Sequence, residues 1–194
     1  MNNLEKYYEV RNQIKAGDVL TWRSPTFYPV AAAIQAWVPK GYHKCCHIST
    51  VVTAPAYADR LMMMEATGAT GVVPIAISHR LEKFHGQVWW HQMKKECMMP
   101  HNREKMERWL WQQAWKEYDF FGVFRQMFSY ISTDARKLFC SELSGEAVKF
   151  CYWGFLSPKT DIEKEAFDKF SRGNALRPWD VVALPIWEPA VRIL

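Results

Sequence analysis

The chain of 194 residues suits a single domain with a sizeable core, because 49% of its residues are hydrophobic and 23% are charged. The net charge of +5 comes from scattered Lys and Arg, which in the densest stretch, 103–108, alternate with Glu as on a solvated helix face. This pattern argues against a nucleic-acid partner, and the lack of an apolar run near ~20 residues argues against an integral membrane segment.

Cysteine content and the first residues bear on the compartment. The five cysteines are odd in number and unevenly spaced, which argues against a disulfide framework and favours a reducing environment. Residues 1–15 are polar and charged, without the apolar segment of a secretory signal. We therefore expect a cytoplasmic protein.

Aromatic residues are unusually frequent, at 15% of the chain with ten Trp. Large rings each bury much apolar area, so this composition favours an aromatic-rich core. An aromatic-lined groove is the alternative.

The first half of the chain is predicted to be rich in strands. Gly17 and Asp18 separate an amphipathic helix from the first strand, and Pro29 suits the first turn of a short helix. The later segments are rich in β-branched and apolar residues, and the short breaks between them are typical of hairpins in an antiparallel sheet. In chain order we expect a helix over 1–15, a strand over 19–22, a helix over 29–38, and strands over 45–53, 61–66, 71–77 and 87–93.

The second half is predicted to be mainly helical. Apolar residues recur at 3/4 spacing from Asn102 to Tyr118, and Gly154 follows another such segment as a helix stop. We expect helices over 102–118, 140–153 and 159–172, followed by a strand over 178–185. A strand-rich half followed by helices and a returning strand predicts one α+β domain over residues 1–194.

Cys140 is the first candidate for chemistry, because the pattern places it in the first turn of a helix. The helix dipole and the free N–H groups there lower a thiol pKa and can hold an oxyanion. Small residues follow at helical spacing, at Ser144, Ala147 and Cys151, and would let the helix lie close against a sheet. The alternative is that Cys140 is a small buried hydrophobic residue.

His47 and Glu65 lie on two of the predicted strands. His47 is set among β-branched residues, where a neutral imidazole tolerates partial burial and is suited to act as a base. The alternative is that His47 is a core histidine bonded to a backbone carbonyl. Glu65 is the only carboxylate in the apolar segment 61–66. Burying it without a partner is costly, so we expect it to meet a cation, a hydrogen-bond donor or a catalytic imidazole. The alternative is that the strand ends at Met64 and Glu65 faces water.

A metal site is the other chemistry to weigh. His43, Cys45, Cys46 and His47 could each bind zinc, but no second ligand pair lies at a usable spacing, and adjacent strand residues point to opposite faces. The chain also has no Walker loop, dinucleotide fingerprint or Gly-x-Ser-x-Gly elbow. We expect neither a metal nor a cofactor.

Six segments stand in a recognisable order along residues 17–184. They are Gly17-Asp18-Val19-Leu20; His47-Ile48-Ser49-Thr50-Val51; Glu65-Ala66 with Gly71-Val72; Tyr118-Asp119-Phe120 with Gly122; Phe139-Cys140-Ser141-Glu142-Leu143; and Arg177-Pro178-Trp179-Asp180-Val181. Together they resemble the permuted, YaeF/YiiX-like branch of the NlpC-type papain-like superfamily, and residues 139–143 resemble it most closely.

The resemblance implies a fold and a triad. The fold would be a circularly permuted papain-like (NlpC-like) fold, with an antiparallel sheet packed against helices and the nucleophile at a helix N-terminus. The triad would be Cys140 as nucleophile, His47 as base and Glu65 as the residue that orients the base. The last segment would be a Pro-x-Asp strand. Ser49 and Trp179 depart from the pattern, because the family has Gly at both positions.

The resemblance implies a cysteine hydrolase that cleaves an amide bond of a peptide or peptidoglycan-like substrate through an acyl-enzyme. One alternative is a lipid substrate, cleaved or transferred by an acyl hydrolase or acyltransferase related to lecithin:retinol acyltransferase. The other is a catalytically inactive binding module on the same fold.

Overall fold

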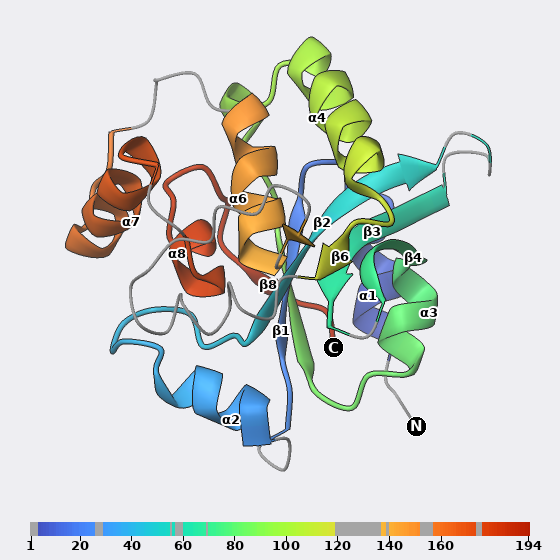
Figure 1. Cartoon of the computed structure of the whole chain (residues 1–194), viewed down its shortest axis with the longest axis horizontal. Coiled ribbons are helices and arrows are strands. Elements are labelled where there is room, and N and C mark those ends of the chain that lie inside the picture. The colour runs from blue at the N-terminus through green and yellow to red at the C-terminus, as the bar shows by residue number, and fades with distance from the viewer. Residues whose placement is uncertain are drawn as a thin grey trace.

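A six-stranded antiparallel sheet organises the structure, which is a computed structural model (Figure 1). The strands are β1 (Val19–Arg23), β2 (His47–Ala54), β3 (Arg60–Thr67), β4 (Gly71–Ala76), β5 (Gln87–His91) and β8 (Val191–Arg192), in the order β4-β3-β2-β1-β5-β8. The structure describes residues 4–25, 29–54, 56, 60–68, 70–118, 137–138, 140–151, 157–173 and 176–194. The expected α+β class, with an antiparallel sheet packed against helices, is confirmed.

Helices cover both faces of this sheet (Figure 1). One face packs against α4 (Pro100–Gln113) and α6 (Cys140–Cys151), and residues of α7 (Asp161–Ser171) and α8 (Pro178–Val182) join the same hydrophobic cluster. The other packs against α1 (Glu5–Val10) and α3 (Ile77–Glu82). The remaining described elements are α2 (Pro29–Ala36), the 3-10 helix η2 (Lys95–Cys97), and the parallel pair β6 (Glu117–Tyr118) and β7 (Lys137–Leu138).

The alternation of side chains along each strand divides the core into these two layers. On β1, Val19 belongs to the layer under α4 and α6, whereas Leu20 and Trp22 belong to the layer under α1 and α3. On β2, Ile48 lies in the first layer and Val51 in the second. The aromatic residues contribute to both layers, as an aromatic-rich core requires.

The predicted strand over 178–185 is wrong, and with it the expected Pro-x-Asp strand. These residues form α8, because Pro178 suits the first helical turn and the Asp180 carboxylate accepts a hydrogen bond from the Arg177 backbone N–H at 2.9 Å. The returning strand is instead β8, which pairs with β5.

Other boundaries also differ from the prediction. The helix over 102–118 ends at Gln113, because Trp115 takes a positive φ of 71° and its N–H bonds to the Val72 carbonyl. The strand over 71–77 stops at Ala76, and α3, which was not predicted, begins at the next residue. The predicted positions at Asp119, Phe120, Gly122, Phe139 and Gly154 lie outside the described residues.

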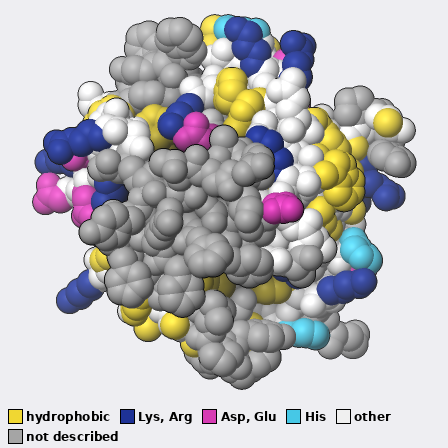
Figure 2. Space-filling view, in the orientation of Figure 1, with side chains coloured by type: hydrophobic (Ala, Val, Ile, Leu, Met, Phe, Trp, Pro, Cys, Tyr) yellow, Lys and Arg dark blue, Asp and Glu magenta, His cyan; other side chains and the backbone are white. Residues whose placement is uncertain are grey.

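The surface shows mixed character. On the face seen in Figure 2, the described Lys and Arg side chains are spread out among acidic and apolar ones rather than gathered in one patch. No helix in the described ranges is both long and apolar enough to cross a membrane.

Candidate active site

Three elements bring the predicted site residues together. Cys140 is the first residue of α6, His47 is the first residue of β2, and Glu65 lies within β3, the neighbour of β2 in the sheet. The small residues of α6 let it lie against β2 as expected, since Ser144 and Ala147 are fully buried there and the Thr50 hydroxyl donates to Ser144 Oγ at 3.0 Å.

The Cys140 thiol is buried yet favours ionisation. Burial raises the pKa of a thiol, but the charge of His47 and a hydrogen bond with it outweigh this effect. The backbone groups of Ile48 and Ser141 add hydrogen bonds to the sulfur. Together these interactions lower the pKa of Cys140 below its ordinary value, as expected for a thiol at a helix N-terminus beside a cation.

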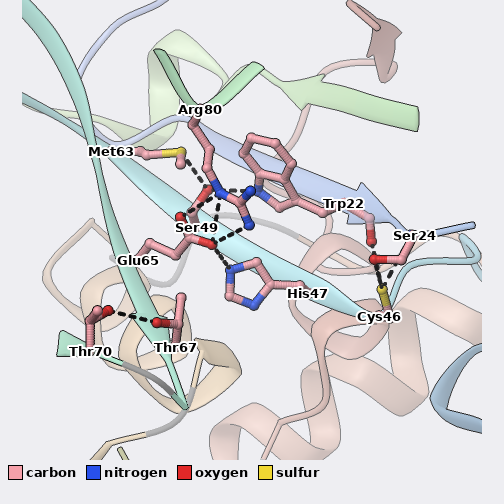
Figure 3. Close-up of polar contacts among 10 residues, drawn as sticks. All are labelled: Trp22, Ser24, Cys46, His47, Ser49, Met63, Glu65, Thr67, Thr70 and Arg80. Atoms are coloured by element: carbon pink, nitrogen blue, oxygen red, sulfur yellow. Dashed lines mark hydrogen bonds and ion pairs between the residues drawn. The ribbon is translucent and has the colours of Figure 1, made fainter. Parts of the chain in front are cut away.

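His47 links the thiol to the carboxylate. Its Nε2 lies 3.0 Å from Glu65 Oε1, which is within ion-pair distance (Figure 3). This contact leaves Nδ1 as the ring nitrogen available to Cys140. Burial alone would lower the pKa of His47, but the Cys140 thiolate and Glu65 raise it to about 10. Each of the two side chains therefore favours the charged form of the other.

Glu65 is fully buried and has two cationic partners. Besides His47, it accepts three hydrogen bonds from Arg80 on α3, at 3.1 to 3.3 Å (Figure 3). Burial would raise the pKa of Glu65, but His47 and Arg80 lower it to about 2. The expectation that a buried Glu65 must meet a cation or an imidazole is confirmed, and the alternative that it faces water is wrong.

Arg80 was not among the predicted site residues. Its own segment, a short helix after β4, carries no motif that distinguishes it from a surface arginine. The one available signal was indirect, since a carboxylate in an apolar strand requires a cation somewhere in the fold.

The four possible zinc ligands of residues 43–47 have separate surroundings. His43 Nε2 lies 3.0 Å from the Thr21 hydroxyl, whereas Cys45 is buried in an apolar cluster. The Cys46 thiol donates to the Trp22 carbonyl at 3.3 Å. Among the residues that the structure describes, no group of three or more His, Cys, Asp or Glu side chains is placed to hold a metal ion.

The two positions that depart from the family pattern are both buried. Ser49 Oγ accepts a hydrogen bond from Trp22 Nε1 at 2.9 Å and donates to Met63 Sδ (Figure 3). These two bonds connect β1, β2 and β3. Trp179, on α8, is 4% exposed and packs with Cys45. Each larger side chain therefore fills space inside the protein rather than projecting from its surface.

Comparison with known proteins adds no further evidence, because the chain matches no protein-family model and no curated protein.

Proposed function

We propose that the chain is a thiol hydrolase of the circularly permuted papain-like kind, in which Cys140, His47 and Glu65 form the triad. The observation that carries this proposal is the buried Cys140 thiol paired with His47 at the start of a helix, with Glu65 3.0 Å from the imidazole. The order of the elements supports the permuted arrangement, because the histidine strand precedes the cysteine helix in the chain.

The geometry supports acyl transfer through a thioester. The Cys140 thiolate attacks the carbonyl carbon of an amide or ester, and the backbone N–H of Cys140 at the start of α6 helps to stabilise the oxyanion that forms. The imidazolium of His47 then gives its proton to the leaving amine or alcohol as the carbon–heteroatom bond breaks. The neutral His47 removes a proton from water, which attacks the thioester, and the acid and the thiolate are released. Glu65 holds the ring in place and stabilises its cation.

The substrate class that we propose is an amide of the peptide or peptidoglycan type. The His47 side chain keeps 18% of its surface exposed, so its imidazole is in contact with solvent. A lipid acyl substrate and an inactive binding module are the competing outcomes of the experiment.

The experiment follows the acyl-enzyme directly. Incubation with p-nitrophenyl acetate, an activated ester, should release p-nitrophenol and add one acetyl group to Cys140, as seen by intact mass and peptide mapping. Cys140→Ala should abolish both signals, whereas Cys46→Ala, a matched change at a partly buried thiol of the same region, should leave them intact. His47→Ala should slow acylation and hydrolysis of the thioester about 100-fold or more.

The same assay separates the alternatives. A panel of muropeptides, model dipeptide amides and long-chain acyl esters identifies the substrate, and turnover only of the acyl esters replaces the amide assignment. Equal turnover by the parent and Cys140→Ala would overturn the thiol hydrolase altogether.

A further inference from the structure

Arg80 makes the most extensive polar contact in the neighbourhood of the proposed triad. Its Nε lies 3.1 Å from Glu65 Oε2 and 3.3 Å from Oε1, and its Nη2 lies 3.1 Å from Oε1. The guanidinium therefore contacts both oxygens of the carboxylate, and Oε1 is shared with His47 Nε2 (Figure 3). A planar fork of this kind fixes the orientation of a carboxylate as well as its charge.

Two aromatic rings hold the guanidinium in place. It lies over the ring of Trp22 at 5.2 Å and over that of Phe84 at 5.5 Å. Trp22 is itself fixed, since its indole N–H donates to Ser49 Oγ. The Arg80 side chain is 31% exposed, so the aromatic rings and Glu65, rather than complete burial, determine its position.

The charges of the four residues alternate along a line of contacts. With His47 protonated and Cys140 deprotonated, as the proposed mechanism requires, Arg80 and His47 are positive and Glu65 and Cys140 are negative. Their sum is zero, which matters because an uncompensated charge in a buried site is costly. Without Arg80 the remaining three groups would carry a net negative charge.

We propose that Arg80 is a positioning residue of the active site: it orients Glu65 toward His47 and balances the negative charge of that buried carboxylate. This inference rests on the proposed function, because it assigns a role within the same triad. Arg80 touches neither the thiol nor the substrate in this scheme and acts only through Glu65.

The role predicts a definite sign for the pH dependence. Removing a positive charge raises the proton affinity of every nearby titrating group, whichever one titrates. Loss of Arg80 should therefore move both the acid limb and the alkaline limb of the plot of Cys140 reactivity against pH to higher pH. Lys at this position keeps the positive charge but loses the two-nitrogen contact with the carboxylate. It should therefore lower the rate of Cys140 alkylation while leaving the midpoints of its pH profile nearly unchanged.

The test is the rate of Cys140 alkylation by iodoacetamide as a function of pH, read by peptide mass mapping. Arg80→Met keeps an unbranched apolar side chain against Trp22 and Phe84 and removes the charge. We expect its acid limb to move up by about half a pH unit or more, which is about a three-fold loss of rate at any pH well below the midpoint of that limb. Arg80→Lys should stay within about 0.2 units of the parent. Arg60→Met, which removes an exposed arginine at the start of β3, is the matched control and should superimpose on the parent.

The possible outcomes are distinguishable. If Cys140 of the parent reacts no faster than an ordinary thiol, the proposed hydrolase fails. If the parent is reactive but the profile of Arg80→Met superimposes on it, only the role of Arg80 is overturned. Thermal unfolding checks that each variant folds. If Arg80→Met does not fold, Arg80→Gln, which keeps a hydrogen-bond donor for Glu65 but not the charge, provides the same pH profile.

Discussion

Two histidines, His47 and His91, sit in environments that shift their pKa values in opposite directions. The pKa of His47 is raised to about 10 by Cys140 and Glu65 despite burial, whereas burial and the neighbouring His43 lower the pKa of His91 to about 3. The hydroxyl of Thr21 lies 3.0 Å from Nε2 of His43 and 2.9 Å from Nε2 of His91, so it connects the two rings. His91 is thus neutral in the folded protein at every pH near neutrality.

His91 should therefore make the protein sensitive to acid. In the unfolded chain its pKa is near the ordinary ~6.5, so the unfolded state binds the extra proton between pH ~6.5 and about 3, and stability falls as the pH falls through that window. The contribution is up to about 1.4 kcal/mol per pH unit. His91→Gln, which keeps an amide for Thr21, should flatten this part of the curve when urea unfolding is measured from pH 7 to pH 4.

The control for this prediction is His101→Gln, a change at an exposed histidine of α4. It should leave the slope of unfolding free energy against pH unchanged. An equal slope in the parent and in His91→Gln would contradict the assignment of a neutral, buried His91.

At the scale of residues, the sequence supported some inferences and not others. The apolar segment around Glu65 predicted a buried carboxylate with a charged partner, because the cost of burying a lone charge is large. It could not identify Arg80, whose contact depends on how α3 folds back over the sheet. Likewise, the sequence marked Ser49 and Trp179 as departures from a Gly pattern, but their burial depends on neighbours from other elements.

At the scale of elements, α6 is the part whose sequence pattern was most informative. Small residues recur on its inner side, where Ser144 bonds to Thr50 and Ala147 is fully buried against the sheet. This close approach is what sets Cys140 beside His47. Any side chain that pushes α6 away from β2 should weaken both the fold and the reactive pair.

Ala147→Leu tests this dependence. Extra methylenes in a filled core typically cost about 1–3 kcal/mol, so urea unfolding should show a loss of that size, together with slower alkylation of Cys140. Lys149→Leu, an exposed position of the same helix with 44% of its side chain accessible, should change the unfolding free energy by no more than about 0.5 kcal/mol. An Ala147→Leu variant as stable and as reactive as the parent would show that α6 has room at the sheet.

Short apolar runs were the elements that sequence reasoning could not resolve. The run at Val181 and Val182 has the composition of a strand, but its length also fits one helical turn, and Pro178 and Asp180 decide in favour of the helix. By contrast, the segments of β2 and β3 were long enough to predict, and their observed bounds differ from the expected ones by one or two residues.

At the scale of the whole molecule, the sheet order determines where the site lies. β2 and β3 are neighbours near the middle of the sheet, so His47 and Glu65 approach across adjacent strands, and α6 crosses on the opposite layer from α3. Antiparallel pairing of consecutive strands could be predicted from short connections. The pairing of β8 with β5 could not, because it joins segments distant in sequence and rests on two residue pairs.

The most direct test of the account is limited alkylation with iodoacetamide at about pH 6, followed by peptide mapping of all five cysteines. An ordinary thiol, with a pKa near ~8.5, reacts slowly there. The account predicts that Cys140 alone is modified quickly and that His47→Ala abolishes this preference. Modification of Cys140 no faster than the other cysteines in the folded protein would contradict the activated thiol and leave the binding module as the interpretation of this fold.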